Sequence, residues 1–239
     1  MAEPNSTRRQ MLLASLSLGG LLACGCTPSR RQALGPPSPV WPIDRRRTSD
    51  MGTRQPRPAS DSRTEVSQAP TCVFPRTAWT RTSPTLALAD RMGRIERITV
   101  HHDAMPSSGF RTAADSKDRL NDILRAHRNN GWADIGYHYA IDPLGNVWAA
   151  RPIQLQGAHV RDWNERNLGI MMMGNFMHEQ PTPQAIGALR ALVASESARY
   201  RVPSARVATH RELASTACPG DALQRQINAS RSRGDAGFG

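Results

Sequence analysis

This chain of 239 residues contains very little lysine and few aromatic residues. Lys117 is the sole lysine, so arginine supplies nearly all of the 31 basic side chains and the net charge of +11. Aromatic residues make up 5% of the chain, and they do not interleave with the arginines in a basic stripe. Because such a stripe is the usual footprint of a nucleic-acid binder, we expect no nucleic-acid partner. The scattered positive charge fits adhesion to anionic polymers or surfaces better.

The sequence also lacks an apolar run long enough to span a bilayer, for which about 20 residues are needed. The uncharged run at 11–23 follows Arg8-Arg9, which is typical of an export signal and resembles its twin-arginine form. The run ends Leu21-Leu22-Ala23-Cys24, which resembles a lipobox, where the cysteine is acylated. We therefore predict an export signal at 1–23, lipidation of Cys24, and anchoring to an envelope membrane facing the periplasm or cell exterior. A secretory signal cleaved without lipidation, or an uncleaved anchor, is the alternative.

Four cysteines do not form the dense pattern of a disulfide-stapled domain. Cys24 has a role as the lipid acceptor, and Cys218 lies in a motif described below. Cys26 and Cys72 could pair in an oxidising compartment, but nothing in the sequence requires it.

Residues 24–71 are rich in proline and arginine and show little hydrophobic periodicity. Such a segment cannot bury enough apolar surface to offset the entropy of ordering its backbone. We predict a disordered tether there, a single folded domain at 72–230, a disordered tail at 231–239, and a monomeric protein.

The rest of the chain alternates strand and helix patterns. Ile98 and Val100 alternate with polar residues within 95–102, which is typical of a strand. Asp115 is expected to cap one helix, and Thr182-Pro183 to begin another. This order predicts an α/β domain with a central mixed β-sheet flanked by helices. The expected strands are 95–102, 137–141, 147–150, 168–173 and 207–209, and the expected helices are 115–129, 183–200 and one that begins at 221.

Three residues near strand ends have the chemistry of a metal site. His101 ends the first expected strand, His210 follows the strand at 207–209, and Cys218 lies eight residues further on. Two imidazoles and one thiolate suit a catalytic Zn²⁺, because three protein ligands leave a fourth position open for water. The three residues lack the tight spacing of a structural zinc motif, so spacing alone leaves open that each is an ordinary hydrogen-bonded side chain.

Four segments in order carry a family resemblance: ITVHHDA at 98–104, GWADIGYHYAIDPLGNVWAAR at 131–151, GAHVRDWNERNLGIMMMGNF at 157–176 and HRELASTACPG at 210–220. They resemble the N-acetylmuramoyl-L-alanine amidases, most of all the branch that phage amidase-lysozymes share with peptidoglycan-recognition proteins. The opening CVFPRTAW is similar to the start of recognition-protein domains, so the resemblance spans about 72–230.

The resemblance implies zinc-dependent hydrolysis of the amide bond between N-acetylmuramic acid and L-alanine in peptidoglycan. It implies that His101, His210 and Cys218 hold the Zn²⁺. It also implies that Tyr137 points its hydroxyl at the metal-bound water or the developing oxyanion. Thr216 stands where some relatives carry lysine and others threonine, so it would donate or relay a hydrogen bond.

Other polar residues in these motifs have two readings. His159 lies where the family has a groove histidine, so it either touches substrate or is structural. Asn164 either holds its loop or binds a stem peptide. His102 alternates to the opposite strand face from His101 and is expected to be structural or to support a metal ligand from outside. No carboxylate in the motifs is an obvious general base, and the nearest, Asp134, is expected to anchor its loop.

The competing function is a non-catalytic peptidoglycan receptor or sensor lipoprotein. In the family, non-catalytic receptors often lack the cysteine ligand, whereas Cys218 is present here, so we favour an enzyme. The segment at 151–156, RPIQLQ, matches neither the Gly-Trp nor the Asn-Phe pair with which recognition proteins distinguish stem peptides. The sequence therefore does not assign a preference for diaminopimelate or lysine stems.

Overall fold

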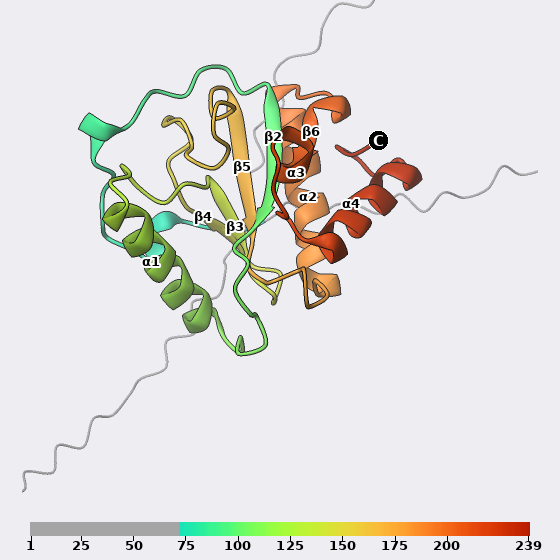
Figure 1. The fold of residues 1–239 in the computed structure, drawn as a ribbon, viewed down its shortest axis with the longest axis horizontal. Coiled ribbons are helices and arrows are strands. Elements are labelled where there is room, and N and C mark those ends of the chain that lie inside the picture. Colours follow the sequence, from blue (N-terminus) through green and yellow to red (C-terminus); the bar gives the residue numbers. More distant parts are fainter. Residues whose placement is uncertain (1–71) are drawn as a thin grey trace, which may run out of the picture. The chain divides into compact units, whose positions relative to one another are not determined.

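The structure is a computed structural model that describes residues 72–239 (Figure 1). The predicted export signal, the lipidation site at Cys24 and the tether at 24–71 lie outside the described residues, as does Cys26. Cys72, the first described residue, is disulfide-bonded. No helix among the described residues combines the length and the apolar character needed to cross a membrane.

The described residues form a mixed sheet with helices on both faces, as the sequence predicts. The sheet has six strands, because a short strand at Val73–Phe74 that was not expected joins the five predicted ones. The strand order is β1-β4-β3-β5-β2-β6. The β3–β4 pair is antiparallel and the other neighbouring strands are parallel. The strands are β1 (Val73–Phe74), β2 (Arg97–His102), β3 (Tyr139–Ile141), β4 (Val147–Ala149), β5 (Asn167–Met172) and β6 (Val207–Thr209). The α-helices are α1 (Ala113–Asn129), α2 (Pro183–Tyr200), α3 (His210–Leu213) and α4 (Asp221–Arg233).

The central strands are buried on both faces, which explains the continuous apolar run in β5. Leu168 and Ile170 face the core beneath α2 and α4, whereas Met171 faces the core beneath α1. Figure 1 shows α1 on one side of the sheet, with α2 and α4 on the other. The methionines of this strand are therefore core residues rather than metal ligands.

The two long helices begin at side-chain caps. The Thr182 hydroxyl accepts the Ala185 N–H, and Pro183 occupies the first turn of α2, as expected. The expected cap of α1 at Asp115 is wrong. Thr112 is the cap, and the Asp115 carboxylate lies in the first turn and accepts the Thr112 N–H to complete a capping box.

The predicted disordered tail at 231–239 is also wrong. Helix α4 continues to Arg233 and ends at Gly234, whose φ of 68° is the left-handed conformation that favours glycine. Phe238 is buried in the core beneath α2 and α4. A single apolar residue in a short polar segment has no periodicity, so the sequence pattern could not reveal that it packs.

Candidate metal centre

The sheet brings two histidines together. Strands β2 and β6 are parallel neighbours, and Val100 pairs with Thr209 in the register. His101 and His210 each follow one of these paired residues, so both leave the same edge of the sheet. Their ring centres lie 4.7 Å apart. His101 is 1% exposed, and His210, the first residue of α3, is half-buried.

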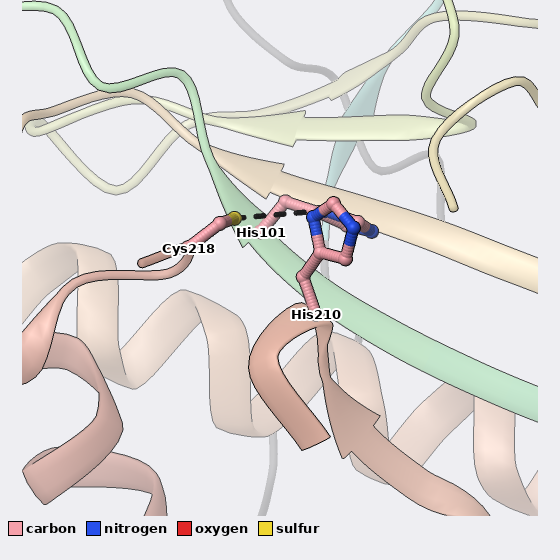
Figure 2. Close-up of side chains that lie close together, drawn as sticks. All are labelled: His101, His210 and Cys218. Atoms are coloured by element: carbon pink, nitrogen blue, oxygen red, sulfur yellow. Dashed lines mark hydrogen bonds between the residues drawn. The ribbon is translucent and has the colours of Figure 1, made fainter. Parts of the chain in front are cut away.

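The loop between α3 and α4 carries Cys218 to the same place. The Cys218 carbonyl accepts the Arg211 N–H at 2.9 Å, and its sulfur accepts the His102 N–H at 3.4 Å. These bonds hold the loop against the end of β2. One nitrogen from each histidine and the Cys218 sulfur lie within 4.8 Å of one another, and Figure 2 shows the three side chains converging.

The separation of these atoms fits a tetrahedral zinc ion. With Zn–S and Zn–N bonds of about 2.3 and 2.1 Å, tetrahedral geometry places sulfur and nitrogen about 3.6 Å apart. The Cys218 Sγ lies 3.7 Å from the His101 Nδ1. Cys218 is also the free cysteine among the described residues, so its sulfur is available as a ligand. The donor set therefore fits Zn²⁺ in its chemistry, and the distance between Cys218 and His101 fits a shared tetrahedral ion.

Burial sets the protonation of the metal-free site. It lowers the pKa of His101 well below its usual value, with further lowering by the neighbouring His159 and His210. It raises the pKa of the Cys218 thiol to about 11. At neutral pH the imidazole is thus neutral, with a lone pair ready for a metal, whereas the thiol must release its proton when a metal binds.

The short helix α3 is pinned by Glu212, whose carboxylate accepts the Thr209 N–H and completes a capping box. The same carboxylate pairs with Arg231 of α4 at 2.7 Å. Burial disfavours the charged carboxylate, but the hydrogen bonds from Arg231, Thr209 and Gln224 outweigh burial and hold its pKa at about 2. This network fixes where His210 leaves the sheet.

We expect Glu212→Gln to lower the free energy of unfolding by about 1 kcal/mol at pH 7, the upper range for a solvent-exposed ion pair. Because the folded-state pKa is depressed, this stabilisation is fully present above the unfolded pKa near 4.5 and is lost as pH falls towards about 2. Urea unfolding of both proteins between pH 7 and pH 3 measures it. A gap between the two proteins that stays constant or widens at low pH would contradict the account.

Tyr137 lies beside the three converging residues. Its ring centre is 5.3 Å from that of His101. It also lines a cavity of about 320 Å³, together with Asp103 at the end of β2 and residues of α1 that include Asp122 and His127. Burial raises the pKa of Tyr137 well above its usual value, with Cys218 and Asp103 adding to the effect. The hydroxyl therefore stays protonated and can donate a hydrogen bond towards this cavity.

Thr216 is exposed in the loop before Cys218. Its hydroxyl oxygen accepts the Cys218 N–H at 3.2 Å, which leaves the hydroxyl proton available to another acceptor. The structure thus places Thr216 beside the cysteine, although its role as a hydrogen-bond donor in a reaction stays a prediction.

The structure places the two predicted substrate residues in one loop. Both ring nitrogens of His159 have protein partners: Nδ1 lies 3.0 Å from the His101 Nε2, and Nε2 lies 3.1 Å from the Asn167 carbonyl. The Asn164 side chain accepts the N–H groups of His159 and Val160, so it holds the loop. Substrate binding by either residue stays a prediction.

The remaining histidines of the motifs have structural partners. His102 faces the opposite side of β2 from His101, as expected, where its Nδ1 accepts the Phe176 N–H. The His138 Nδ1 accepts the N–H of Gly169. Asp134 anchors its loop through a 2.8 Å ion pair with Arg76.

The sequence reading missed Asp103. Its carboxylate pairs with Arg119 of α1 at 2.8 Å and accepts the Gly174 N–H. Burial raises its pKa, although the Gly174 and Met105 N–H groups and Arg119 act in the opposite direction. Its position directly after the two histidines at a strand end was the available signal. Asp103 ties the end of β2 to α1 and lines the cavity.

Comparison with known proteins assigns the chain to a family. The family described as N-acetylmuramoyl-L-alanine amidase matches residues 91–221, more than half of the chain, and the chain belongs to this family. The peptidoglycan-recognition protein SC2 of Drosophila melanogaster is 33% identical over 135 residues, which cover 56% of this chain and 72% of that protein. An N-acetylmuramoyl-L-alanine amidase of Sus scrofa is 33% identical over 129 residues, which cover 53% of this chain but 22% of that protein.

A solved structure with a similar fold is that of peptidoglycan recognition protein LE in complex with tracheal cytotoxin, a monomeric diaminopimelic acid-type peptidoglycan. It is 28% identical, has a TM-score of 0.60, and the match covers 66% of this chain and 92% of that chain. The relatives therefore include proteins named as amidases and proteins named as recognition proteins.

Proposed function

We propose that this chain is a zinc-dependent N-acetylmuramoyl-L-alanine amidase that cleaves the bond between N-acetylmuramic acid and L-alanine in peptidoglycan. The main support is that one possible ligand atom from each of His101, His210 and Cys218 lies within 4.8 Å of the others, in a chain of the amidase family. Tyr137 stands beside that set, at the wall of a cavity that can take part of a substrate.

The side chains have separate tasks in this reaction. A zinc ion held by the three ligands would polarise the scissile carbonyl and lower the pKa of a water molecule to about 7. The Tyr137 hydroxyl donates a hydrogen bond to the carbonyl oxygen as negative charge develops there. The Thr216 hydroxyl, in the loop that carries Cys218, donates a second hydrogen bond to the same oxygen. The cavity beside Tyr137 holds the stem peptide so that the scissile bond lies over the metal centre.

The experiment that tests this function is digestion of purified peptidoglycan, with products identified by mass. We expect free stem peptides that begin with L-alanine, and glycan strands with the lactyl carboxylate restored. A chelator should abolish their release, and added Zn²⁺ should restore it. Binding of peptidoglycan without release of peptides at any zinc concentration would make the chain a receptor instead.

We also propose that the mature protein is a lipoprotein of the cell envelope, with Cys24 acylated. The support is the Arg8-Arg9 pair, the apolar run after it and the cysteine that follows Ala23. This location would place the protein where peptidoglycan is. Mass spectrometry of the mature N-terminus tests it, and an N-terminus without acyl groups would refute it.

A further inference from the structure

His159 contacts the ring nitrogen of His101 that does not face Cys218. It is 8% exposed, and its Nδ1 lies 3.0 Å from the Nε2 of His101. The other nitrogen of His101, Nδ1, is the one that lies 3.7 Å from the Cys218 sulfur. The His101 ring therefore has one nitrogen towards the candidate ligands and the other towards His159.

The hydrogen bonds fix which nitrogens carry protons. The Asn167 carbonyl can only accept, so the Nε2 of His159, 3.1 Å away, must donate to it. In a neutral imidazole the other nitrogen is then an acceptor, so the Nδ1 of His159 accepts a proton from the Nε2 of His101. His101 is thereby left with its lone pair on Nδ1, facing Cys218.

Two glycines pack directly against the His159 ring. A Cβ atom at Gly157 would lie 2.4 Å from the His159 Cδ2, and one at Gly169 would lie 2.6 Å from the same atom. The Asn164 side chain holds the loop that carries the ring by accepting the His159 N–H at 2.8 Å. Two glycines and one asparagine thus define the position of the imidazole.

We propose that His159 is a positioning residue of the metal centre: by accepting the Nε2 proton of His101, it holds that imidazole in the tautomer whose Nδ1 lone pair faces Cys218. Hydrogen-bonded partners of this kind orient metal-ligating histidines, and their loss costs about 10–100-fold in metal affinity. The inference deepens the proposed function, because it rests on a metal ion bound to His101.

Two substitutions separate this role from simple packing. In His159→Asn, the amide oxygen is bonded to Cγ as Nδ1 is in histidine, so an acceptor for His101 remains. In His159→Gln, the amide nitrogen lies close to the place of Nε2, so the bond to Asn167 remains but the acceptor is lost. We expect His159→Gln to bind Zn²⁺ about 10–100-fold more weakly than the wild type, and His159→Asn to retain most of the affinity.

The measurements are zinc affinity by competition with a chelator, and ¹⁵N NMR of the imidazoles in the metal-free wild type. We expect the His101 proton on Nε2. A His101 proton on Nδ1, or a His159→Gln protein that binds zinc as tightly as the wild type, would overturn the inference alone. A wild type that does not bind zinc would overturn both this inference and the proposed function. The NMR measurement decides the question even where a variant fails to fold.

Discussion

Cys218→Ser is expected to abolish the release of stem peptides from peptidoglycan and to weaken zinc binding by more than about 100-fold. A hydroxyl of serine remains protonated at neutral pH and is a poor substitute for thiolate as a ligand of Zn²⁺. The expected loss of zinc affinity is larger than the decrease of about 10–100-fold that is typical when a residue that hydrogen-bonds a ligand, rather than the ligand itself, is removed. Zinc content of the purified protein and the rate of peptide release measure the two effects.

The matched control for this variant is Ser215→Ala, an exposed position in the same loop. It should leave zinc content and turnover unchanged, and both variants should unfold at similar denaturant concentrations. A Cys218→Ser protein that released stem peptides at the wild-type rate would remove the thiolate from the mechanism. Retained peptidoglycan binding by the inactive variant would separate recognition from hydrolysis.

Tyr137→Phe should lower kcat by about 10²–10³-fold while leaving the zinc content unchanged, because removal of one oxyanion donor has this cost. Its hydroxyl is the donor beside His101, and burial keeps it protonated over the working pH range. The aromatic ring and its packing are retained in phenylalanine. Steady-state kinetics on a soluble muropeptide, with metal analysis of the same sample, measure the effect.

The control for Tyr137→Phe is Tyr200→Phe at the end of α2, which changes the same chemical group on an element that supplies none of the proposed ligands. The control should retain the wild-type kcat. If Tyr137→Phe changed KM alone, the hydroxyl would bind the ground state rather than the developing charge. A Tyr137→Phe protein that lost its zinc would instead make the tyrosine part of the support of the site.

Much of the fold could be predicted because its pattern is local. The alternation around Ile98 and the apolar run in β5 identify buried strands, and Thr182-Pro183 identifies the start of α2. The predictions were wrong where backbone geometry or tertiary packing, and not the local sequence pattern, determines the structure. Thr112 and Asp115 both suit a cap, and only the backbone geometry selects the former. Phe238 is buried in a core cluster that includes residues of α2 and α4, which no local pattern contains.

The candidate ligands could be proposed from their residue types and from the family resemblance, but their proximity could not. It depends on the parallel register that sets Val100 beside Thr209 and on the Arg211 bond that returns the loop to Cys218. His159 and His101 are 58 residues apart in the sequence and are joined by a single hydrogen bond. The sequence alone therefore could not decide whether His159 contacts substrate or has a structural role.

A crystal of the zinc-loaded protein, measured at the zinc absorption edge, would show whether His101, His210 and Cys218 hold a zinc ion. We expect an anomalous peak bounded by the Nδ1 of His101, a ring nitrogen of His210 and the Sγ of Cys218, with no fourth ligand from the protein. No peak among these three side chains, or a zinc ion that is bound by other residues, would show that they do not form the metal site.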